Sequence, residues 1–394
     1  MIWFAAIVIV APAAFFAYAY VGYPVILRVL AARRPAPAAP SVPTDGEWPY
    51  ISITVPAYNE ERSIRRTLEE LLRVDYPADR RQILVISDGS TDRTDDIVRE
   101  FHARGVELLR IPQRAGKTAA ENAAGRTVRY DLIVNTDASV RIPPTSLKPL
   151  VRAFADPTVG VASGRDVSVG DEAREANRAE SGYVGYEMRI RDLETRVGSI
   201  VGASGCFFGF RRAVNDTDFP EGLSRDFASA LLARERGYRA VSVDDALVIV
   251  PRTTSLQAEY RRKIRTMARG IQTLWYKRHL MNPFRYGVFA FMLVSHKLCR
   301  WLVYLAIPPA ALAIAVLATR WTPALFLLAA GVAAWGAGIV ALRWPEERRM
   351  PRLLALVGFA AVSALAGVMA WVRVFRRQRD VKWEPTRRPG AAAA

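Results

Sequence analysis

Long apolar runs lie at both ends of the chain and enclose a charged middle region. Residues 1–30 are almost continuously apolar, and runs of similar character follow near residues 302–318, 322–342 and 353–373. A helix that spans a bilayer needs about 20 apolar residues. We therefore expect an N-terminal transmembrane anchor in residues 1–30 and about three C-terminal transmembrane helices in residues 301–374.

A cleaved signal peptide is the alternative interpretation of the first apolar run. No basic segment precedes this run, and it is longer than the apolar core of a typical signal peptide. These features favour an uncleaved anchor.

Two segments separate the apolar runs from the middle region. Residues 31–49 are rich in Pro and Ala, which is typical of a semi-rigid linker. Residues 279–300 mix apolar residues with His296, Lys297 and Arg300, which indicates an interfacial amphipathic segment. A helix buried beneath the middle domain is the alternative for this second segment.

The middle region, residues 50–278, alternates strand-like and helix-like patterns. Such alternation predicts an α/β fold class with a mostly parallel sheet. The expected strands are short apolar runs at residues 51–56, 83–87, 106–111 and 132–136, and the expected helices are at residues 60–73, 92–101 and 115–128.

Polar clusters follow three of the expected strands. They are Tyr58-Asn59-Glu60, Asp88-Gly89-Ser90 and Asp137-Ala138-Ser139. Ligands of open α/β sheets bind beyond the carboxyl ends of the strands, so these clusters predict one shared site.

Common nucleotide-binding motifs do not fit this sheet. No Gly-x-Gly-x-x-Gly follows the first strand, which argues against a dinucleotide site. Gly116-Lys117-Thr118 resembles the end of a P-loop, but Ile111 stands where that loop requires glycine. We reject an NTPase, although Lys117 can still neutralise phosphate as a point charge.

Charge and cysteine content indicate the cellular compartment and the membrane orientation of the protein. The formal net charge is +17, and much of it lies beside the apolar runs, as in Arg33 and Arg34. The positive-inside rule then predicts a multi-pass protein of the inner, cytoplasmic membrane with a cytosolic catalytic domain. The only cysteines, Cys206 and Cys299, fit a reducing compartment. No nucleic-acid-binding module is recognisable, so we expect no nucleic-acid partner.

The side on which the C-terminal tail lies stays open at this stage. One anchor and three later spans place residues 375–394 outside, whereas the basic character of this tail favours the inside. Either residues 282–300 also enter the membrane, or one later run does not cross it.

An ordered set of motifs runs through residues 50–278 and resembles the family 2 inverting glycosyltransferases of GT-A fold. The likeness is to the membrane-bound branch that includes cellulose, hyaluronan and poly-N-acetylglucosamine synthases. It implies a UDP-sugar donor, a polysaccharide or lipid-linked acceptor, a lipid bilayer and a Mg²⁺ or Mn²⁺ cofactor. The motifs begin with Pro56-Ala57-Tyr58-Asn59-Glu60, Asp88-Gly89-Ser90 and Gly116-Lys117-Thr118.

The resemblance assigns donor binding to the first motifs. Pro56, Tyr58 and Glu60 match the segment that holds uridine, Asp88 matches the residue at the base or ribose, and Lys117 lies near uridine or phosphate. For Asp88, a turn residue before glycine is the structural alternative.

Asp137 and Ser139 occupy the position of the family's Asp-x-Asp motif. The resemblance makes them donor and metal ligands, because a hard divalent ion offsets the charge of a diphosphate. Ser139 replaces the second aspartate and is a weaker ligand. A strand-end loop aspartate is the structural alternative for Asp137.

Asp226 matches the catalytic base, which takes a proton from the acceptor hydroxyl. Arg225 stands where the family usually has Glu, and a helix N-cap is a compatible second role for Asp226. Gly202, Ser204 and Gly205 match the glycine-bearing acceptor loop, for which a tight turn is the alternative.

The last motif, Gln-x-x-Arg-Trp, is only partly present. Arg265 matches its Arg and is assigned to the donor, while Arg262 and Thr266 replace Gln and Trp. Arg262 and Arg269 are candidates to bind the leaving diphosphate. A solvated or lipid-facing charge run is the alternative for both.

The expected activity is transfer of a sugar in exopolysaccharide or cell-envelope glycan synthesis by a hexosyl- or N-acetylhexosaminyltransferase. A non-processive transferase that adds one sugar to a lipid carrier or glycolipid is the alternative, favoured by Thr266. A catalytically inactive membrane scaffold is the alternative from another class, supported by Ser139 and Arg225.

Overall fold

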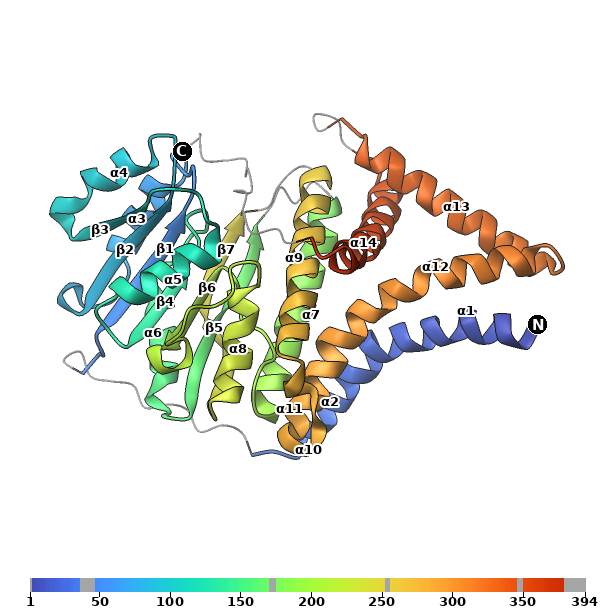
Figure 1. Ribbon diagram of the computed structural model, residues 1–394, viewed down its shortest axis with the longest axis horizontal. Coiled ribbons are helices and arrows are strands. Elements are labelled where there is room, and N and C mark those ends of the chain that lie inside the picture. The colour runs from blue at the N-terminus through green and yellow to red at the C-terminus, as the bar shows by residue number, and fades with distance from the viewer. Residues whose placement is uncertain (1, 36–46, 170–174, 252–255, 346–349, 379–394) are drawn as a thin grey trace. The chain divides into compact units, whose positions relative to one another are not determined.

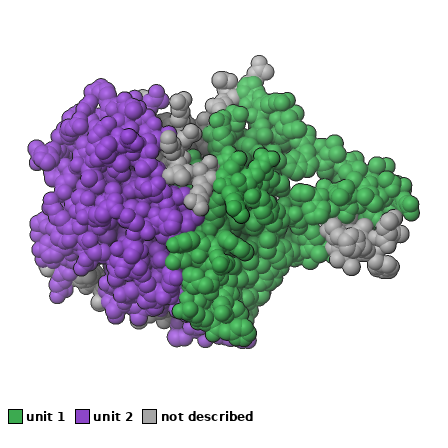
Figure 2. Space-filling view, viewed as in Figure 1, with its two compact units in different colours: residues 1–30, 170–182, 253–379 green, residues 31–169, 183–252, 380–394 purple. Residues whose placement is uncertain are grey.

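The computed structural model describes residues 2–35, 47–169, 175–251, 256–345 and 350–378. The chain divides into two compact units, which Figure 2 shows in different colours. We call residues 31–169 and 183–252 the α/β unit. We call residues 1–30 and 253–379, with the short segment 170–182, the helical unit.

A seven-stranded sheet forms the centre of the α/β unit (Figure 1), with strand order β3-β2-β1-β4-β6-β5-β7. β6 is antiparallel to both of its neighbours, and the other adjacent strands pair in parallel. The strands are β1 Ile51–Ala57, β2 Arg81–Asp88, β3 Val106–Ile111, β4 Leu132–Thr136, β5 Val159–Val169, β6 Phe207–Arg211 and β7 Arg239–Pro251.

Helices cover both faces of this sheet, and each face has its own apolar core. Leu68 of α3 and Leu150 of α6 belong to one core, and Ala120 of α5 and Ala228 of α8 belong to the other. The helices are α3 Ile64–Leu72, α4 Thr94–Glu100, α5 Lys117–Thr127, α6 Leu147–Arg152, α7 Glu175–Val197 and α8 Arg225–Glu235. The predicted α/β class with a mostly parallel sheet is confirmed.

Four stretches of the helical unit are long and apolar enough to cross a membrane, among the residues that the structure describes: Val10–Ala32, Val288–Ala318, Thr322–Leu342 and Arg352–Phe375. The helices of this unit are α1 Ile2–Ala17, α2 Tyr23–Ala32, α9 Leu256–Tyr276, α10 Pro283–Tyr286, α11 Val288–Leu293, α12 Cys299–Ala318, α13 Thr322–Leu342 and α14 Arg352–Phe375.

Helices α12 and α13 form a hairpin. Helix α14 packs against the end of α13 and the start of α12, which together form the open end of this hairpin. Leu317 and Ala324 pack together at the closed end. Near the start of α14, Gly358 lies against Ala341 at the end of α13. Near its end, the indole of Trp371 donates a hydrogen bond of 2.8 Å to the carbonyl of Trp301 at the start of α12.

Candidate active site

The loops that follow β1 and β2 are tied together at the carboxyl edge of the sheet. Parallel pairing aligns Ala57 with Ser87, so both strands end at one level. Asn59 then adopts a positive φ of 53°, which Asn tolerates better than most residues. Its side-chain oxygen accepts a 2.8 Å hydrogen bond from the Thr91 amide. Two of the predicted polar clusters therefore form one rim.

Asp88 organises the next loop of this rim. Its carboxylate is buried and accepts hydrogen bonds from the amides of Ala115 at 2.7 Å and Gly116 at 2.8 Å. Gly89 has a φ of +66°, and a Cβ there would lie 2.8 Å from the Arg114 amide nitrogen. The turn therefore requires glycine, and Asp88 fixes the residues that precede Lys117.

Tyr58 and Arg114 form a flat, cationic surface at the same edge. The Arg114 guanidinium lies 3.9 Å from the centre of the Tyr58 ring. Cation–π contacts of this kind hold a guanidinium over an aromatic ring. Pro56 lies within β1, and the backbone amide of Glu60 is held by the Thr94 hydroxyl at 2.8 Å.

Lys117 connects two of the predicted site residues. Its ammonium lies 2.6 Å from Asp137 Oδ1 and donates a second bond, of 2.9 Å, to the carbonyl of Gly205. Burial alone would lower the pKa of Lys117, but attraction to Asp137, Glu121 and Asp226 raises it above the ordinary lysine value. Lys117 is therefore a fixed cation among three carboxylates.

Asp226 completes this group from the first turn of α8. Its carboxylate is so close to Gly205 that a Cβ there would lie 2.5 Å from Asp226 Oδ2. The Ser224 hydroxyl donates to Asp226 Oδ1 at 2.5 Å. The structure thus brings Lys117, Asp137, Gly205 and Asp226 together.

Two further charged residues near this group, Glu121 and Arg225, were not assigned to the site from the sequence. Glu121 and Arg225 are both buried, and Arg225 donates to the side chain of Asn122. Burial raises the pKa of Glu121, while the charges of Lys117 and Arg225 oppose that rise. Burial lowers the pKa of Arg225. Glu121 follows Lys117 by four residues on a predicted helix. Residues with this spacing are neighbours on a helix surface, so the sequence could have indicated that Glu121 lies near Lys117.

The glycine-bearing loop is held by β5. Ser204 donates from its hydroxyl to Asp166 Oδ1 at 2.6 Å and from its amide to Ser163 Oγ at 2.8 Å. Gly202 is buried in the same loop. Asp166 was not predicted, because only the fold places it beside Ser204.

The metal role of Asp137 and Ser139 stays a prediction, although their oxygen donors are of the kind that suits a hard divalent ion. Among the described residues, no group of three or more His, Cys, Asp or Glu side chains could hold a metal. One carboxylate and one hydroxyl are too few protein ligands to enclose a metal ion, and Lys117 already bonds to Asp137. Mg²⁺ is commonly held by one or two carboxylates together with substrate phosphates, which is compatible with this pair.

Three predicted basic residues belong to the other unit. Arg262, Arg265 and Arg269 lie on α9 of the helical unit. Arg262 forms a forked ion pair with Glu259, with contacts of 2.8 and 2.6 Å. Their assignment to donor and diphosphate stays a prediction.

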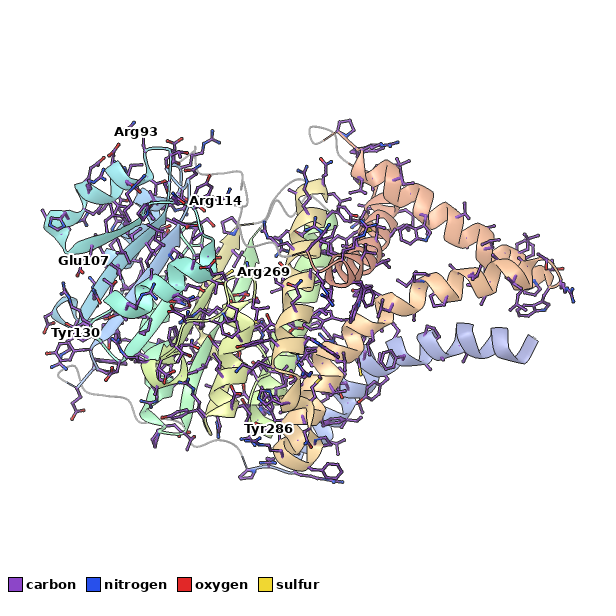
Figure 3. The ribbon with its side chains drawn as sticks, in the orientation of Figure 1. Arg93, Glu107, Arg114, Tyr130, Arg269 and Tyr286 are labelled. Atoms are coloured by element: carbon purple, nitrogen blue, oxygen red, sulfur yellow. The ribbon has the colours of Figure 1, made fainter. Side chains whose placement is uncertain are left out.

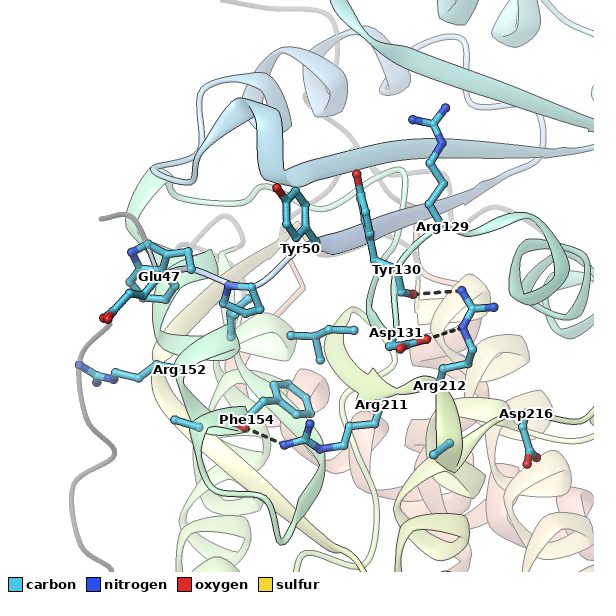
Figure 4. A pocket seen from close by; sticks show the side chains of 16 residues that line it. Glu47, Tyr50, Arg129, Tyr130, Asp131, Arg152, Phe154, Arg211, Arg212 and Asp216 are labelled. Carbon is cyan, nitrogen blue, oxygen red and sulfur yellow. Dashed lines mark hydrogen bonds and ion pairs between the residues drawn. The ribbon is translucent and has the colours of Figure 1, made fainter. Parts of the chain in front are cut away.

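A cavity of about 870 Å³ lies at the opposite edge of the same sheet (Figure 4). Tyr130, at this edge, and Arg114 are labelled well apart in the α/β unit (Figure 3). Arg211 binds the carbonyl oxygens of Val159 and Phe154, and Arg212 binds Asp131. These arginines, which follow the glycine-bearing loop in sequence, therefore stabilise loops far from Gly205 along β6.

Comparison with known proteins finds similarity to glycosyltransferases. Residues 52–219 match Glycosyl transferase family 2. The chain is 30% identical over 157 residues to beta-monoglucosyldiacylglycerol synthase of Synechocystis sp., covering 39% of this chain and 33% of that protein. It is 24% identical over 259 residues to an N-acetylglucosaminyltransferase of a Rhizobium species, covering 58% and 54%.

Among solved structures, the mannosyltransferase PcManGT of Pyrobaculum calidifontis, in complex with GDP-Man and Mn²⁺, has a similar fold. Its TM-score is 0.74 at 23% identity, over 95% of this chain and 99% of that one. The chain spans about a third to a half of the length of the two curated relatives named above. The sheet order and this solved structure show a GT-A fold, and residues 52–219 match Glycosyl transferase family 2.

Proposed function

We propose that this protein is a membrane-bound inverting glycosyltransferase that moves a sugar from a UDP-sugar to a hydroxyl of a lipid-borne acceptor. The observation that carries the proposal is the contact group of Lys117, Asp137, Gly205 and Asp226 at the carboxyl edge of the sheet. It combines a fixed cation for a leaving diphosphate with a carboxylate that can accept a proton.

Asp226 is the base in this mechanism. Its carboxylate takes the proton of the acceptor hydroxyl while that oxygen attacks the anomeric carbon. The bond between the anomeric carbon and the diphosphate oxygen breaks, and UDP leaves with the electron pair. One displacement inverts the anomeric centre, so an α-linked donor gives a β-linked product.

The leaving group is stabilised by positive charge that is already in place. Lys117 is held at 2.6 Å from Asp137, so little reorganisation is needed when charge develops on the diphosphate. Asp137 and Ser139 would hold a Mg²⁺ or Mn²⁺ ion, which supplies Lewis-acid neutralisation of the diphosphate when bound.

The rim of the site supports nucleotide binding. Tyr58 offers an aromatic face beside the guanidinium of Arg114, and Asp88 fixes the loop between Arg114 and Lys117. A base stacked at Tyr58 would place its diphosphate toward the ammonium of Lys117. Since the solved neighbour binds GDP-Man, GDP-sugars are the donors to test against UDP-sugars.

A lipid-borne acceptor is favoured over a long polymer. The Synechocystis relative is named for a glucosyl lipid, and Thr266 replaces the Trp of the motif found in polymer synthases. Polymer synthesis is the second candidate, because the matches that cover 58% of the chain are named N-acetylglucosaminyltransferases.

The helical unit supports a membrane topology with three crossings. The first, through α1 and α2, leads into the α/β unit, and α12 and α13 then cross as a hairpin. Gly358 of α14 lies at the open end of α13 and Trp371 at the open end of α12, so both parts of α14 are at one level. We propose that α14 lies along the cytosolic surface of the inner membrane and that the basic tail is cytosolic.

A donor screen tests the proposed function. Purified full-length protein is incubated with single UDP- or GDP-sugars, Mg²⁺ or Mn²⁺, and a membrane lipid extract, and the released nucleoside diphosphate is measured. We expect one UDP-sugar to give lipid-dependent release and a chloroform-soluble product. Release without any glycosylated lipid but with a product of high mass would support the polymer candidate. No release with any donor would contradict the proposal and support an inactive scaffold.

A further inference from the structure

Side chains of β5 hold both the hydroxyl and the amide of Ser204. The Ser204 hydroxyl donates a hydrogen bond of 2.6 Å to Asp166 Oδ1, and the Ser204 amide donates one of 2.8 Å to Ser163 Oγ. The same hydroxyl accepts a 3.1 Å hydrogen bond from the amide of Cys206, because a hydroxyl can donate and accept at once. Ser204 is 1% exposed. Gly205 therefore lies between two residues whose positions depend on β5.

Two charged residues of the candidate active site rest on Gly205. Its carbonyl accepts a 2.9 Å hydrogen bond from the ammonium of Lys117. The carboxylate of Asp226 lies where a Cβ of Gly205 would stand. A shift of Gly205 would therefore displace an acceptor of Lys117 and change the space beside Asp226. Ser204 connects Asp166 to both of these residues.

A break in the pairing of β5 allows Ser163 and Asp166 to reach the same residue. Successive side chains of a regular strand point to opposite faces, so residues three positions apart would face opposite ways. In β5 the pairing with β7 changes register between Ser163 and Arg165. Gly164 lies at this break, and a Cβ there would be 2.7 Å from the ring of Phe207. Such irregularities often re-aim a side chain beside an active site.

A carboxylate before the start of β5 offers a comparison. Asp156 Oδ1 accepts a hydrogen bond from the Thr158 hydroxyl at 2.6 Å, the same distance as between Ser204 and Asp166. The Asp156 bond stabilises a local turn, because its partner is two residues away. The Asp166 bond instead reaches a buried loop 38 residues further along the chain. The two aspartates therefore make equal bonds with different consequences.

We propose that Asp166 is a positioning residue for the transfer reaction. It fixes Gly205 through Ser204. In this way it keeps Lys117 and Asp226 in the arrangement that the reaction needs. This inference rests on the proposed function. A positioning role requires an oxygen that accepts the proton of the Ser204 hydroxyl, whereas a role as a base would require the carboxylate itself.

Steady-state kinetics of the purified full-length protein test this role, with the UDP-sugar that the donor screen identifies and the membrane lipid extract. We expect Asp166→Ala to lower kcat about tenfold or more without a change in the KM of the donor. Ser204→Ala should cause the same loss, and the double variant should lose no more, because the two residues act as one unit. Asp166→Asn should recover most of the rate, since its amide oxygen can accept the hydrogen bond. Asp156→Ala should keep the wild-type kcat.

Three results would overturn the proposal. A wild-type kcat in Asp166→Ala would show that Gly205 keeps its position without Asp166. An Asp166→Asn enzyme as slow as Asp166→Ala would assign Asp166 to proton transfer or charge stabilisation instead. Additive losses in the double variant would show that Asp166 does not act through Ser204.

Two further comparisons keep the test decisive. If Asp166→Ala does not fold, Ser204→Ala and Asp166→Asn decide alone, because the proposal predicts a slow enzyme for the first and a nearly wild-type enzyme for the second. A wild-type protein that transfers no sugar would overturn the proposed function together with this inference. An active wild type with an unaffected Asp166→Ala variant would overturn this inference alone.

Discussion

The carboxylate of Asp226 lies directly against Gly205. A Cβ on Gly205 would stand 2.5 Å from Asp226 Oδ2, and the nearest atoms belong only to that side chain. Asp226 can rotate away at small cost, but its carboxylate would then leave the position beside Lys117. A substitution at Gly205 is therefore expected to lower activity while it changes stability little.

We predict that Gly205→Ala lowers the transfer rate about 100-fold, because a displacement of about 1 Å is enough for such a loss. Its free energy of unfolding should change by less than about 1 kcal/mol. Gly125→Ala is the matched control, since a Cβ there has no neighbour within 4 Å. A Gly205→Ala enzyme with the wild-type rate would refute the placement of Asp226.

Lys117 is predicted to be essential for transfer. Lys117→Gln removes the cation that bonds to Asp137 at 2.6 Å and to the Gly205 carbonyl at 2.9 Å. We expect the turnover rate to fall about 10²–10³-fold, as for other groups that stabilise transition-state charge. Lys148→Gln breaks a 2.8 Å ion pair with Asp75 and should leave the rate unchanged. Equal rates in the two variants would exclude the proposed role.

The carboxyl pair of Asp192 and Asp244 is predicted to make stability depend on pH. Burial, a hydrogen bond to Asp244 and repulsion from its charge raise the pKa of Asp192 from 3.8 to about 7, while Arg165 and Arg196 oppose the shift. The folded-state pKa is above the unfolded value. Its stabilising contribution is therefore complete below about pH 4 and is lost as the pH rises through about 7.

Thermal unfolding between pH 4 and 8 tests this dependence. The pair is only half-buried, so solvent screening reduces its contribution to about 1 kcal/mol, or about 2–4 °C in Tm. Asp192→Asn should flatten the pH profile by that amount. Asp245→Asn, at a neighbouring side chain that is 79% exposed, should keep the wild-type profile. A profile unchanged by Asp192→Asn would contradict the assignment.

The position of α14 predicts the side on which the tail lies. A fluorescent-protein fusion after residue 378 should fluoresce, because that reporter folds in the cytosol. An alkaline phosphatase fusion after residue 320, between α12 and α13, should be active, because that reporter folds outside. If phosphatase is active after residue 378 as well, α14 crosses the membrane and the three-crossing topology is wrong.

The first half of the sheet could be predicted from the sequence because β1 to β4 are apolar runs separated by helices. β5 to β7 were not predicted. β5 contains Gly164, Arg165 and Asp166, so its pattern is broken, and antiparallel β6 does not follow the alternation. Sheet pairing, rather than local pattern, fixes these strands.

Site residues in strand-end motifs could also be predicted, since Lys117, Asp137 and Asp226 each lie at the start of a helix or the end of a strand. Their partners could not. Asp166 meets Ser204, and Arg114 meets Tyr58, only because the chain folds back across the sheet. The roles of Arg262, Arg265 and Arg269 also depend on tertiary placement and stay predictions.

The central claim is that Asp226 is the base of an inverting transfer. Asp226→Asn keeps the size of the side chain and removes its capacity to accept the proton. Transfer by this variant and by Asp218→Asn, an exposed control that pairs with Arg126, is measured with the donor found in the screen, beside UDP binding by calorimetry. We predict that Asp226→Asn loses transfer by about 10³-fold or more and binds UDP as the wild type does. Wild-type turnover in Asp226→Asn would contradict the claim.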